Sequence, residues 1–395
     1  GFIFLFMLEF TCGFQIHLMG NNCALSKQDE FADRSGNTNY SKGDYFFNVR
    51  EYGATGDGLT DDSDAVQEAM TNAAASGHGV VYLPEGQYLL RKVIEWVRPV
   101  GNRSLNGLVV RGDGTGKTVI IVDNSEGGFK VDDFYNLTQF QFRNMTILAA
   151  RPDAGTAISV GKFGNRMGAR GYRCFSGENI EVRGLTPADY FDWGVRVTSL
   201  YRPLFKNVTF TGATSEGNEF NAFTGISANG CYSPEFENCR VEYVTHAYRY
   251  VPSGETDEGP EGGTFHKCIA DNCIIGIDID NPINEPGQVV NFCVLRCRDV
   301  GLRMSKKKFY QVRNNIFEPL LNPADHEYKD ISSLGSFMGV HHKNIFKKFS
   351  GGESTEDNRT SVSFDESGWV HDNHNMIVMN NVFPGTGTEI GGEEL

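Results

Sequence analysis

A short motif recurs seven times along the chain, and this internal repeat limits the possible folds more than any other feature of the sequence. In each copy a small residue is followed by an apolar, a variable and a second apolar residue. The copies begin at Gly128, Ala157, Gly194, Gly225, Ala247, Gly276 and Gly301. They lie a few tens of residues apart, which suits one coil of a solenoid for each copy. The sequence therefore predicts an all-β protein whose short strands stack coil upon coil as a parallel β-helix.

A second recurring element lies between these copies and usually starts with asparagine, at Asn144, Asn179, Asn207 and Asn238. Side-chain amides at the same corner of successive coils can hydrogen-bond to one another along the stack. We therefore expect an asparagine ladder, although Asn144 and Asn207 also lie in N-glycosylation sequons.

Cysteine follows the same repeat, since Cys239, Cys268 and Cys293 take one equivalent position in successive elements. The chain has nine cysteines, an odd number that excludes a complete set of disulfides within one chain. A stack of small buried thiols is therefore expected in preference to disulfide bridges.

Composition favours many short strands joined by tight turns. The chain has 46 Gly, 29 Phe and 15 Tyr, and only 22% of its residues are charged. Its formal net charge of −14 argues against a general nucleic-acid binder, because phosphate contacts require an extensive excess of Lys and Arg. Nucleic acid is therefore not an expected partner.

The apolar run at residues 2–8 is too short to cross a bilayer, and no later segment is long enough. It has the character of a signal-peptide core. We therefore expect a secreted or extracellular protein, with the periplasm as an alternative. Four parts are predicted: an unassigned leader at 1–43, an N-terminal cap at 44–95, the parallel β-helix at 96–383 and a flexible tail at 384–395.

The cap segment predicts a strand, a glycine-rich turn, a helix and two further strands. Asp61 or Asp62 is expected to cap the helix. The stretch FNVREYGATGDGLTDDSDAVQEAM, with GVVYLPEGQYLL after it, resembles the opening segment of the pectate-lyase superfamily and of polygalacturonase-related proteins. The resemblance implies a single-stranded, right-handed parallel β-helix with an N-terminal capping helix. Hydrolases, lyases, epimerases and phage tailspikes share this segment, so no single reaction follows from it.

Alternation along each strand places the variable residue of every motif copy on the outside. Stacking the copies gives one outward column, Lys130, Ser159, Arg196, Ser227, Arg249, Asp278 and Arg303. Its four cations suit a polyanionic sugar chain, because arginine forks onto carboxylate and sulfate groups. An acidic polysaccharide is therefore the expected partner, bound by Lys130, Trp193, Arg196 and Asp280.

Pectate lyases, which this chain resembles, cleave by β-elimination with an arginine base and with acidic residues that hold calcium. By that resemblance Arg249 or Arg303 would be the base, and Asp278 with Asp280 would hold a calcium ion or the sugar. The alternative is structural. An aspartate between two arginines is also the pattern of a surface ion-pair ladder, which contributes about 0–1 kcal/mol per pair.

Polygalacturonases, by the same resemblance, carry carboxylates at the start of successive strands. The corresponding residues here include no acid: Thr156, Trp193, Thr224, His246, Ile275 and Val300. A hydrolase remains an alternative, because carboxylates elsewhere could supply the acid pair: Asp189, Asp192, Glu255, Asp257 and Glu258. His246 is ambiguous, since strict alternation buries it with Tyr248, whereas a turn before Ala247 would expose it as a base or a sugar contact.

The leading hypothesis is a polysaccharide lyase that acts on an acidic glycan, with His246, Arg249, Asp278 and Arg303 as its catalytic residues. A glycoside hydrolase with relocated acids is the first alternative. A non-catalytic, tailspike-like glycan-binding protein is the second. The chain is expected to be a monomer or a homotrimer.

Overall fold

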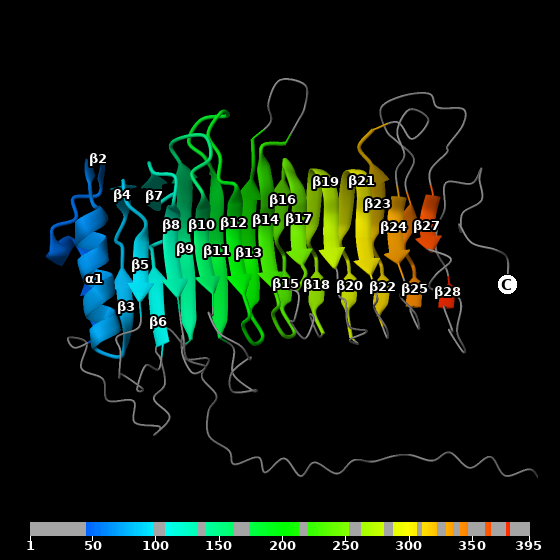
Figure 1. The fold of residues 1–395 in the computed structure, drawn as a ribbon, viewed down its shortest axis with the longest axis horizontal. Coiled ribbons are helices and arrows are strands. Elements are labelled where there is room, and N and C mark those ends of the chain that lie inside the picture. The colour runs from blue at the N-terminus through cyan, green and yellow to red at the C-terminus, as the bar shows by residue number, and fades with distance from the viewer. Residues whose placement is uncertain are drawn as a thin grey trace, which may run out of the picture. The chain divides into compact units, whose positions relative to one another are not determined.

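Parallel strands dominate the computed structural model of this chain, and strands of neighbouring coils pair in register. The strands follow one another along the long axis of Figure 1 in chain order. The structure describes residues 45–97, 107–132, 139–161, 174–213, 220–252, 262–279, 287–305, 310–321, 329–334, 340–346, 360–364 and 377–379. The predicted all-β parallel β-helix is confirmed.

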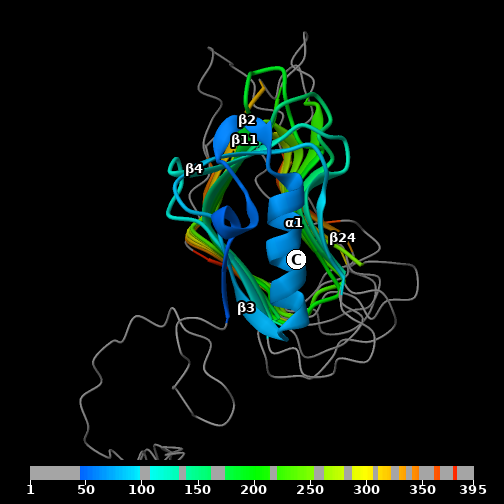
Figure 2. The same ribbon diagram turned by 90° about the vertical axis from the view of Figure 1, so that its left-hand side faces the viewer.

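Each coil has three faces, which are visible end-on in Figure 2. Face 1 is formed by β5 (Ile94–Val97), β8 (Gly127–Asp132), β10 (Thr156–Gly161), β12 (Trp193–Thr198), β14 (Ala222–Asn229), β17 (Val244–Tyr250), the second halves of β19 (Ile269–Ile279) and β21 (Val294–Ser305), β24 (Lys329–Leu334) and β27 (Thr360–Phe364).

Face 2 precedes face 3 within each coil. Face 2 is formed by β1 (Phe46–Asn48), β3 (His78–Tyr82), β6 (Gly107–Arg111), the first halves of β9 (Phe140–Ala149), β11 (Phe175–Gly184) and β13 (Leu204–Thr211), then β15 (Glu235–Glu237), β18 (Thr264–His266), β20 (Val289–Asn291), β22 (Gln311–Arg313), β25 (Val340–His342) and β28 (Ile377–Met379). Face 3 is formed by β2 (Asp57–Asp61), β4 (Gly86–Leu90), β7 (Thr118–Val122), the remaining halves of the long strands, β16 (Arg240–Glu242), β23 (Ile316–Pro319) and β26 (Ile345–Phe346).

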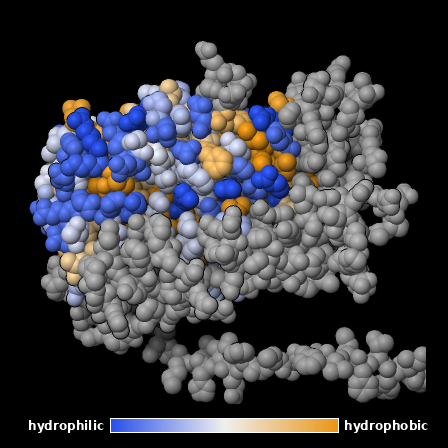
Figure 3. Space-filling model, in the orientation of Figure 1, coloured by the Kyte–Doolittle hydropathy of each residue, from blue (hydrophilic) through white to orange (hydrophobic). Residues whose placement is uncertain are grey.

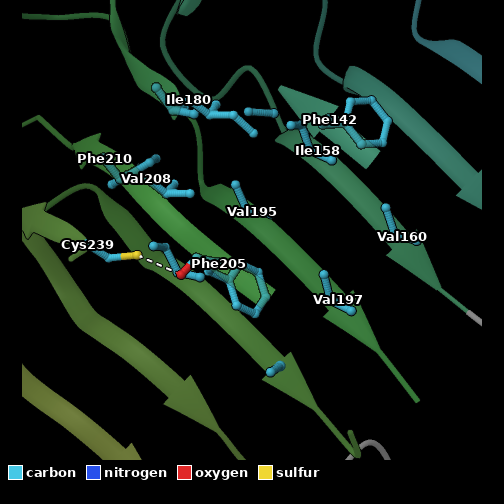
Figure 4. Close-up of a cluster of buried hydrophobic side chains, with 14 of the residues drawn as sticks. Phe142, Ile158, Val160, Ile180, Val195, Val197, Phe205, Val208, Phe210 and Cys239 are labelled. Carbon is cyan, nitrogen blue, oxygen red and sulfur yellow. Dashed lines mark hydrogen bonds between the residues drawn. The ribbon is translucent and has the colours of Figure 1, made fainter. Parts of the chain in front are cut away.

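The core lies inside the coils, where the apolar residues of each motif copy meet those of the other faces. Val195 and Val197 of β12 and Ile158 and Val160 of β10 are each at most 1% exposed, and Figure 4 shows them with residues of β11 and β13. The small first residue of each copy has a steric reason. A Cβ atom at Gly194 would lie 2.3 Å from Gly225 O and 2.3 Å from the Phe210 ring.

The corner between faces 2 and 3 carries the predicted asparagine ladder. Asn144, Asn179, Asn207 and Asn238 all have positive φ, between 52° and 61°, a conformation that asparagine tolerates better than most residues. Each amide Nδ2 donates to the Oδ1 atom of the preceding rung, over distances of 2.8–3.0 Å. The ladder is therefore confirmed, and it orders the backbone where each coil turns.

The predicted thiol stack is also confirmed. Cys239, Cys268 and Cys293 are at most 1% exposed and are free thiols. Each Sγ lies 3.3–3.6 Å from a carbonyl oxygen of the preceding coil, as the dashed line from Cys239 to Phe205 shows in Figure 4. Small polarisable thiols therefore fill the interior next to this corner.

The helix α1 (Ser63–Ala75) packs against β1, β3 and β5 and lies across the end of the coils that faces the viewer in Figure 2. Asp62 takes the N-cap position, but its carboxylate does not bind the helix. Instead it accepts hydrogen bonds from Thr55 N (2.7 Å) and Gly56 N (3.1 Å). Asp62 thus orders the glycine turn that follows the short 3₁₀ helix Val49–Tyr52, whereas Asp61, the other predicted cap residue, accepts a hydrogen bond from Ser63 N at 3.0 Å at the start of the helix.

Hydrophilic residues predominate on the coloured part of the face in Figure 3, with apolar residues in smaller groups between them. In the described ranges, no helix has both the length and the apolar character needed to span a bilayer. The predicted leader at 1–43 and tail at 384–395 lie outside the described residues. The predicted division into four parts therefore stays a prediction.

Candidate functional site

The predicted outward column exists as a register on face 1. Lys130, Ser159, Arg196, Ser227, Arg249, Asp278 and Arg303 follow one another as directly paired residues of adjacent strands. One part of the prediction is wrong, because two members are not exposed. Ser227 is 0% and Asp278 1% exposed. The short side chains lie below the level of the longer arginines beside them.

Asp278 is the centre of this column. Arg303 Nε donates to its Oδ1 at 2.8 Å and Arg303 Nη2 to its Oδ2 at 2.7 Å, so the guanidinium binds both oxygens. Arg249 Nε lies 3.8 Å from Oδ2 on the other side. Burial alone would raise the pKa of Asp278, but the contacts with His246 and Arg303 outweigh it and lower the pKa to about 2. The carboxylate therefore stays ionised at neutral pH.

His246 joins this centre from the start of β17. Its Nδ1 atom lies 3.1 Å from Asp278 Oδ2, although the residue is only 8% exposed. Tyr248 and Tyr250 point inward, and their hydroxyls donate to Cys239 O and Cys231 O. His246 and Arg249, three residues apart, thus face the same carboxylate. Inward and outward side chains do not alternate strictly along β17, because Ala247 between His246 and Tyr248 is also buried. His246 therefore lies on the face-1 side and not in the core with Tyr248.

An aromatic row links this centre to the earlier coils. The Phe223 ring lies 5.1 Å from the His246 ring on one side and 5.1 Å from the Trp193 ring on the other. Arg249 Cζ lies 5.5 Å from the Phe223 centroid, and Arg196 Cζ lies 4.6 Å from the Trp193 centroid. The structure thus brings Trp193 and Arg196 next to the same row of side chains as His246.

Phe223 and Thr224 are the residues that the sequence analysis did not assign to the site. Thr224 is paired with both Trp193 and His246, and it was predicted only as a position that lacks an acid. Thr224 Oγ1 and Ser227 Oγ are buried and have no hydrogen-bond partner within the described part of the chain. The sequence did carry a signal for Phe223, because this residue directly precedes Thr224, which the repeat aligns with Trp193 and His246.

Lys130 lies on the same column but away from the centre. Its Nζ binds Glu95 Oε1 at 2.9 Å, and Glu95 precedes it in the column. Four strands separate Lys130 from Asp278 along face 1: β10, β12, β14 and β17. Lys130 therefore does not join the His246 cluster. It would contact a bound polymer only near the N-terminal end of face 1.

A calcium ion does not fit Asp278. Both carboxylate oxygens are engaged by Arg303, and Arg249 and His246 lie against Oδ2, so cations already surround the group. Asp280, the other expected ligand, lies outside the described residues. In the described ranges, no cluster of three or more His, Cys, Asp and Glu side chains is suited to hold a metal ion.

The acids that kept a hydrolase open are only partly described. Asp189 Oδ2 accepts from Thr186 N and Thr186 Oγ1, which assigns it to a local turn. Half-burial and the nearby Asp153 raise the pKa of Asp192. Glu255, Asp257 and Glu258 lie outside the described residues. No described pair of these acids faces the His246 cluster.

Sequence comparison finds a family match in the N-terminal part of the chain and curated relatives over short stretches. Residues 46–149 match the family model described as rhamnogalacturonase A/epimerase, pectate lyase-like. Mannuronan C5-epimerase AlgE1 of Azotobacter vinelandii is 42% identical over 84 residues, which are 20% of this chain and 6% of that protein. Alginate lyase 7 of the same organism is 55% identical over 42 residues, 11% of this chain and 5% of that protein. The chain thus spans a small fraction of these curated relatives.

Solved structures extend the likeness to most of the chain. The A-module of mannuronan C5-epimerase AlgE6 from Azotobacter vinelandii superposes with a TM-score of 0.57 and 16% identity, covering 85% of this chain and 98% of that chain. Tailspike protein 2 of an Escherichia coli O157:H7 bacteriophage covers 85% of this chain and 42% of its own, with a TM-score of 0.56 and 11% identity. At such identities the likeness concerns the fold. The chain is therefore a parallel β-helix protein, and its residues 46–149 are similar to the pectate lyase-like family model.

Proposed function

We propose that the face-1 cluster of His246, Arg249, Asp278 and Arg303 removes the proton next to the carboxylate of a uronate in an acidic polysaccharide, and that β-elimination then cleaves the chain. The observation that carries the proposal is the convergence of one histidine and two arginines on a single buried carboxylate. Such a cluster offers a proton acceptor beside fixed positive charge, which are the two groups that this chemistry requires.

His246 is the proton acceptor that the geometry favours. The Asp278 carboxylate lies 3.1 Å from Nδ1 without an aligned hydrogen bond, and its charge favours the tautomer that carries the proton on Nδ1, which leaves the Nε2 lone pair as the base. The arginines suit this role poorly, because a guanidinium beside a carboxylate stays protonated. The proposal therefore moves the base from Arg249 or Arg303, as family resemblance implied, to His246.

Arg249 supplies charge to the substrate. Its side chain is 28% exposed and lies 3.8 Å from Asp278, whereas Arg303 is held in place by two hydrogen bonds to that residue. A uronate carboxylate at Arg249 would gain electron density as the C5 proton leaves. A positioned guanidinium stabilises that charge in the transition state. Asp278 is thus a positioning residue that orients both His246 and Arg303.

Two outcomes share this first step. The C5–H bond breaks, the proton passes to His246 Nε2, and the electron pair is delocalised into the uronate carboxylate. In a lyase the pair then forms a C4–C5 double bond and the C4–O bond breaks, so the leaving oxygen takes up a proton. In an epimerase a proton returns to C5 from the opposite side. C5 epimerisation is the second candidate, because the curated relatives, which match short stretches of the chain, include mannuronan C5-epimerases as well as an alginate lyase.

The test is proton exchange at C5. Polymannuronate, alginate and pectate are incubated with the protein in D₂O, and NMR records deuterium at C5 together with the ratio of the two C5 epimers. Ultraviolet absorbance records unsaturated ends. Unsaturated ends support the lyase, and deuterium with inversion but no cleavage supports the epimerase. Reducing ends without either signal would establish a hydrolase, and binding without any product would establish a glycan-binding protein.

Asp278→Asn provides the critical variant, and Asp271→Asn is its matched control. Asp271 also lies on β19, and it is also flanked by arginines of the neighbouring coils, Arg240 at 3.2 Å and Arg296 at 3.3 Å, but on face 3. We expect Asp278→Asn to abolish C5 exchange and Asp271→Asn to preserve it. Equal activity in both variants would reduce the Asp278 cluster to a structural ion-pair ladder.

Secretion and the oligomeric state also belong to the proposal. A polymeric glycan is met outside the cell, which agrees with the apolar start of the chain. Fractionation of the source cells tests the location, and light scattering of the purified protein distinguishes a monomer from a homotrimer.

A further inference from the structure

The cations of face 1 occupy every second coil. Lys130, Arg196, Arg249 and Arg303 alternate with the shorter Ser159, Ser227 and Asp278 in the paired register. Adjacent parallel strands lie about 4.8 Å apart, so successive cations are separated by roughly 10 Å along the stack. A regular array of positive charge thus runs parallel to the axis of the β-helix.

The pair Trp193 and Arg196 repeats the geometry of the proposed centre two coils earlier. Trp193 pairs with Thr224, which pairs with His246, and Arg196 pairs with Ser227, which pairs with Arg249. Trp193 and Arg196 therefore occupy the same two register positions on β12 that His246 and Arg249 occupy on β17. The Phe223 ring touches both the Trp193 ring and the His246 ring at 5.1 Å, so one continuous row of side chains joins the two positions.

Arg196 is held differently from the other cations. Its guanidinium lies over the Trp193 ring, with Cζ 4.6 Å from the centroid. Within the described residues no carboxylate lies within 4.0 Å of Arg196, although Asp192 is near enough for the Arg196 charge to favour its ionised form; Lys130 by contrast binds Glu95 and Arg303 binds Asp278. Between Arg196 and Arg249 on face 1 lie the buried hydroxyl groups of Thr224 and Ser227, which have no hydrogen-bond partner in the described part of the chain. A carboxylate of the ligand would therefore complete the Arg196 environment.

We propose that Trp193 and Arg196 form a second binding subsite, which holds the uronate two sugar residues away from the one at Arg249. The inference rests on the proposed function. Consecutive sugars of an extended 1,4-linked chain are turned over, so that carboxylates face one side at every second residue. Each sugar advances by about one coil. The chain then lies along the β-helix axis, with alternate carboxylates at Arg196 and Arg249 and the indole of Trp193 against a sugar face.

Oligouronates of increasing length test the subsite. They are prepared from the polymer on which the wild-type protein acts. We expect kcat/KM to rise when the oligomer becomes long enough to reach Arg196 from Arg249. In Arg196→Ala this rise disappears, because KM increases by about tenfold or more for long oligomers and much less for short ones. Lys206→Ala, which removes the cation paired with Glu237 on face 2, is the control and leaves the length dependence intact.

Failure of the subsite and failure of the proposed chemistry give different results. An Arg196→Ala protein that keeps the length dependence, or that loses activity equally on short and long oligomers, overturns the subsite. If the wild-type protein transforms no uronate, the chemistry fails, and calorimetric binding of polymannuronate and polygalacturonate decides the subsite. Loss of binding in Arg196→Ala alone would support it. Unchanged binding in Arg196→Ala, or no binding by the wild-type protein, would overturn it.

Discussion

His246 Nδ1 lies 3.1 Å from Asp278 Oδ2, although the two residues belong to neighbouring coils and are separated by 32 positions in the chain. The contact exists because β17 and the second half of β19 pair in register, with Arg249 opposite Asp278. It places an imidazole against an ionised carboxylate at a site of low solvent exposure. Two consequences of this contact can be measured, one on catalysis and one on stability.

Replacement of His246 by Gln should lower kcat for C5 exchange by about 10²–10⁴-fold, because it removes the proposed proton acceptor. The folded state should persist, as judged by circular dichroism. His266→Gln is the control, since His266 lies on face 2 with its ring 5.7 Å from the Phe292 ring. Equal losses in the two variants would argue for a general structural effect, and full activity of His246→Gln would remove the base assignment.

Asp278→Asn should destabilise the protein in a pH-dependent way. The folded-state pKa of Asp278 is lowered from 3.8 to about 2, so the ionised carboxylate stabilises the folded chain above about pH 4. This contribution, about 2 kcal/mol, is lost as the pH falls from about 4 to about 2. Urea unfolding should therefore show a difference between wild type and variant at pH 7 that shrinks below pH 4. A difference that is the same at both pH values would contradict this account.

Substitutions at Asn207 distinguish two contributions of the asparagine ladder to stability, the amide hydrogen bonds and the tolerance of a left-handed backbone. Its Nδ2 donates to Asn179 Oδ1, its Oδ1 accepts from Asn238 Nδ2, and its φ is +52°. Asn207→Ala and Asn207→Gly both lose the amide hydrogen bonds, but only glycine adopts this backbone without a steric penalty. We expect the alanine variant to be less stable than the glycine variant by about 1 kcal/mol in denaturant titrations. Equal stabilities would mean that the left-handed turn costs nothing here.

Three core thiols, those of Cys239, Cys273 and Cys293, should be unreactive in the folded protein. Burial raises the pKa of Cys273 to about 12, and Cys239 and Cys293 are also shifted upward by burial. At neutral pH these groups therefore remain protonated and shielded. Brief treatment with iodoacetamide, followed by peptide mass mapping, should leave these cysteines unmodified in native protein and modify them after unfolding. Rapid native modification would show that the coils open around residues 239–293.

The asparagine and cysteine positions show how far local pattern reaches. The pairs Asn238-Cys239 and Lys267-Cys268 repeat in the sequence, and the structure stacks them. In a later coil, Asn315 takes the inward position that cysteine holds in the earlier coils. Its Nδ2 donates to Val290 O and to Asn344 Oδ1. The left-handed residue of that coil is Asn314, not Asn315. A polar side chain can replace a thiol in this interior when carbonyl oxygens and amides satisfy it.

The repeat by itself determined the register of face 1. A small residue and two inward apolar residues recur in each coil, and parallel stacking then forces the intervening residues into one column, so Arg249, Asp278 and Arg303 could be aligned from the sequence. Only the tertiary structure decided which of them meet. The burial alternation of β17 is interrupted at Ala247, His246 lies beside Asp278, and that carboxylate is buried between the arginines of neighbouring coils. These contacts depend on side-chain length and on backbone bends across coils, which a pattern of inward and outward positions does not encode.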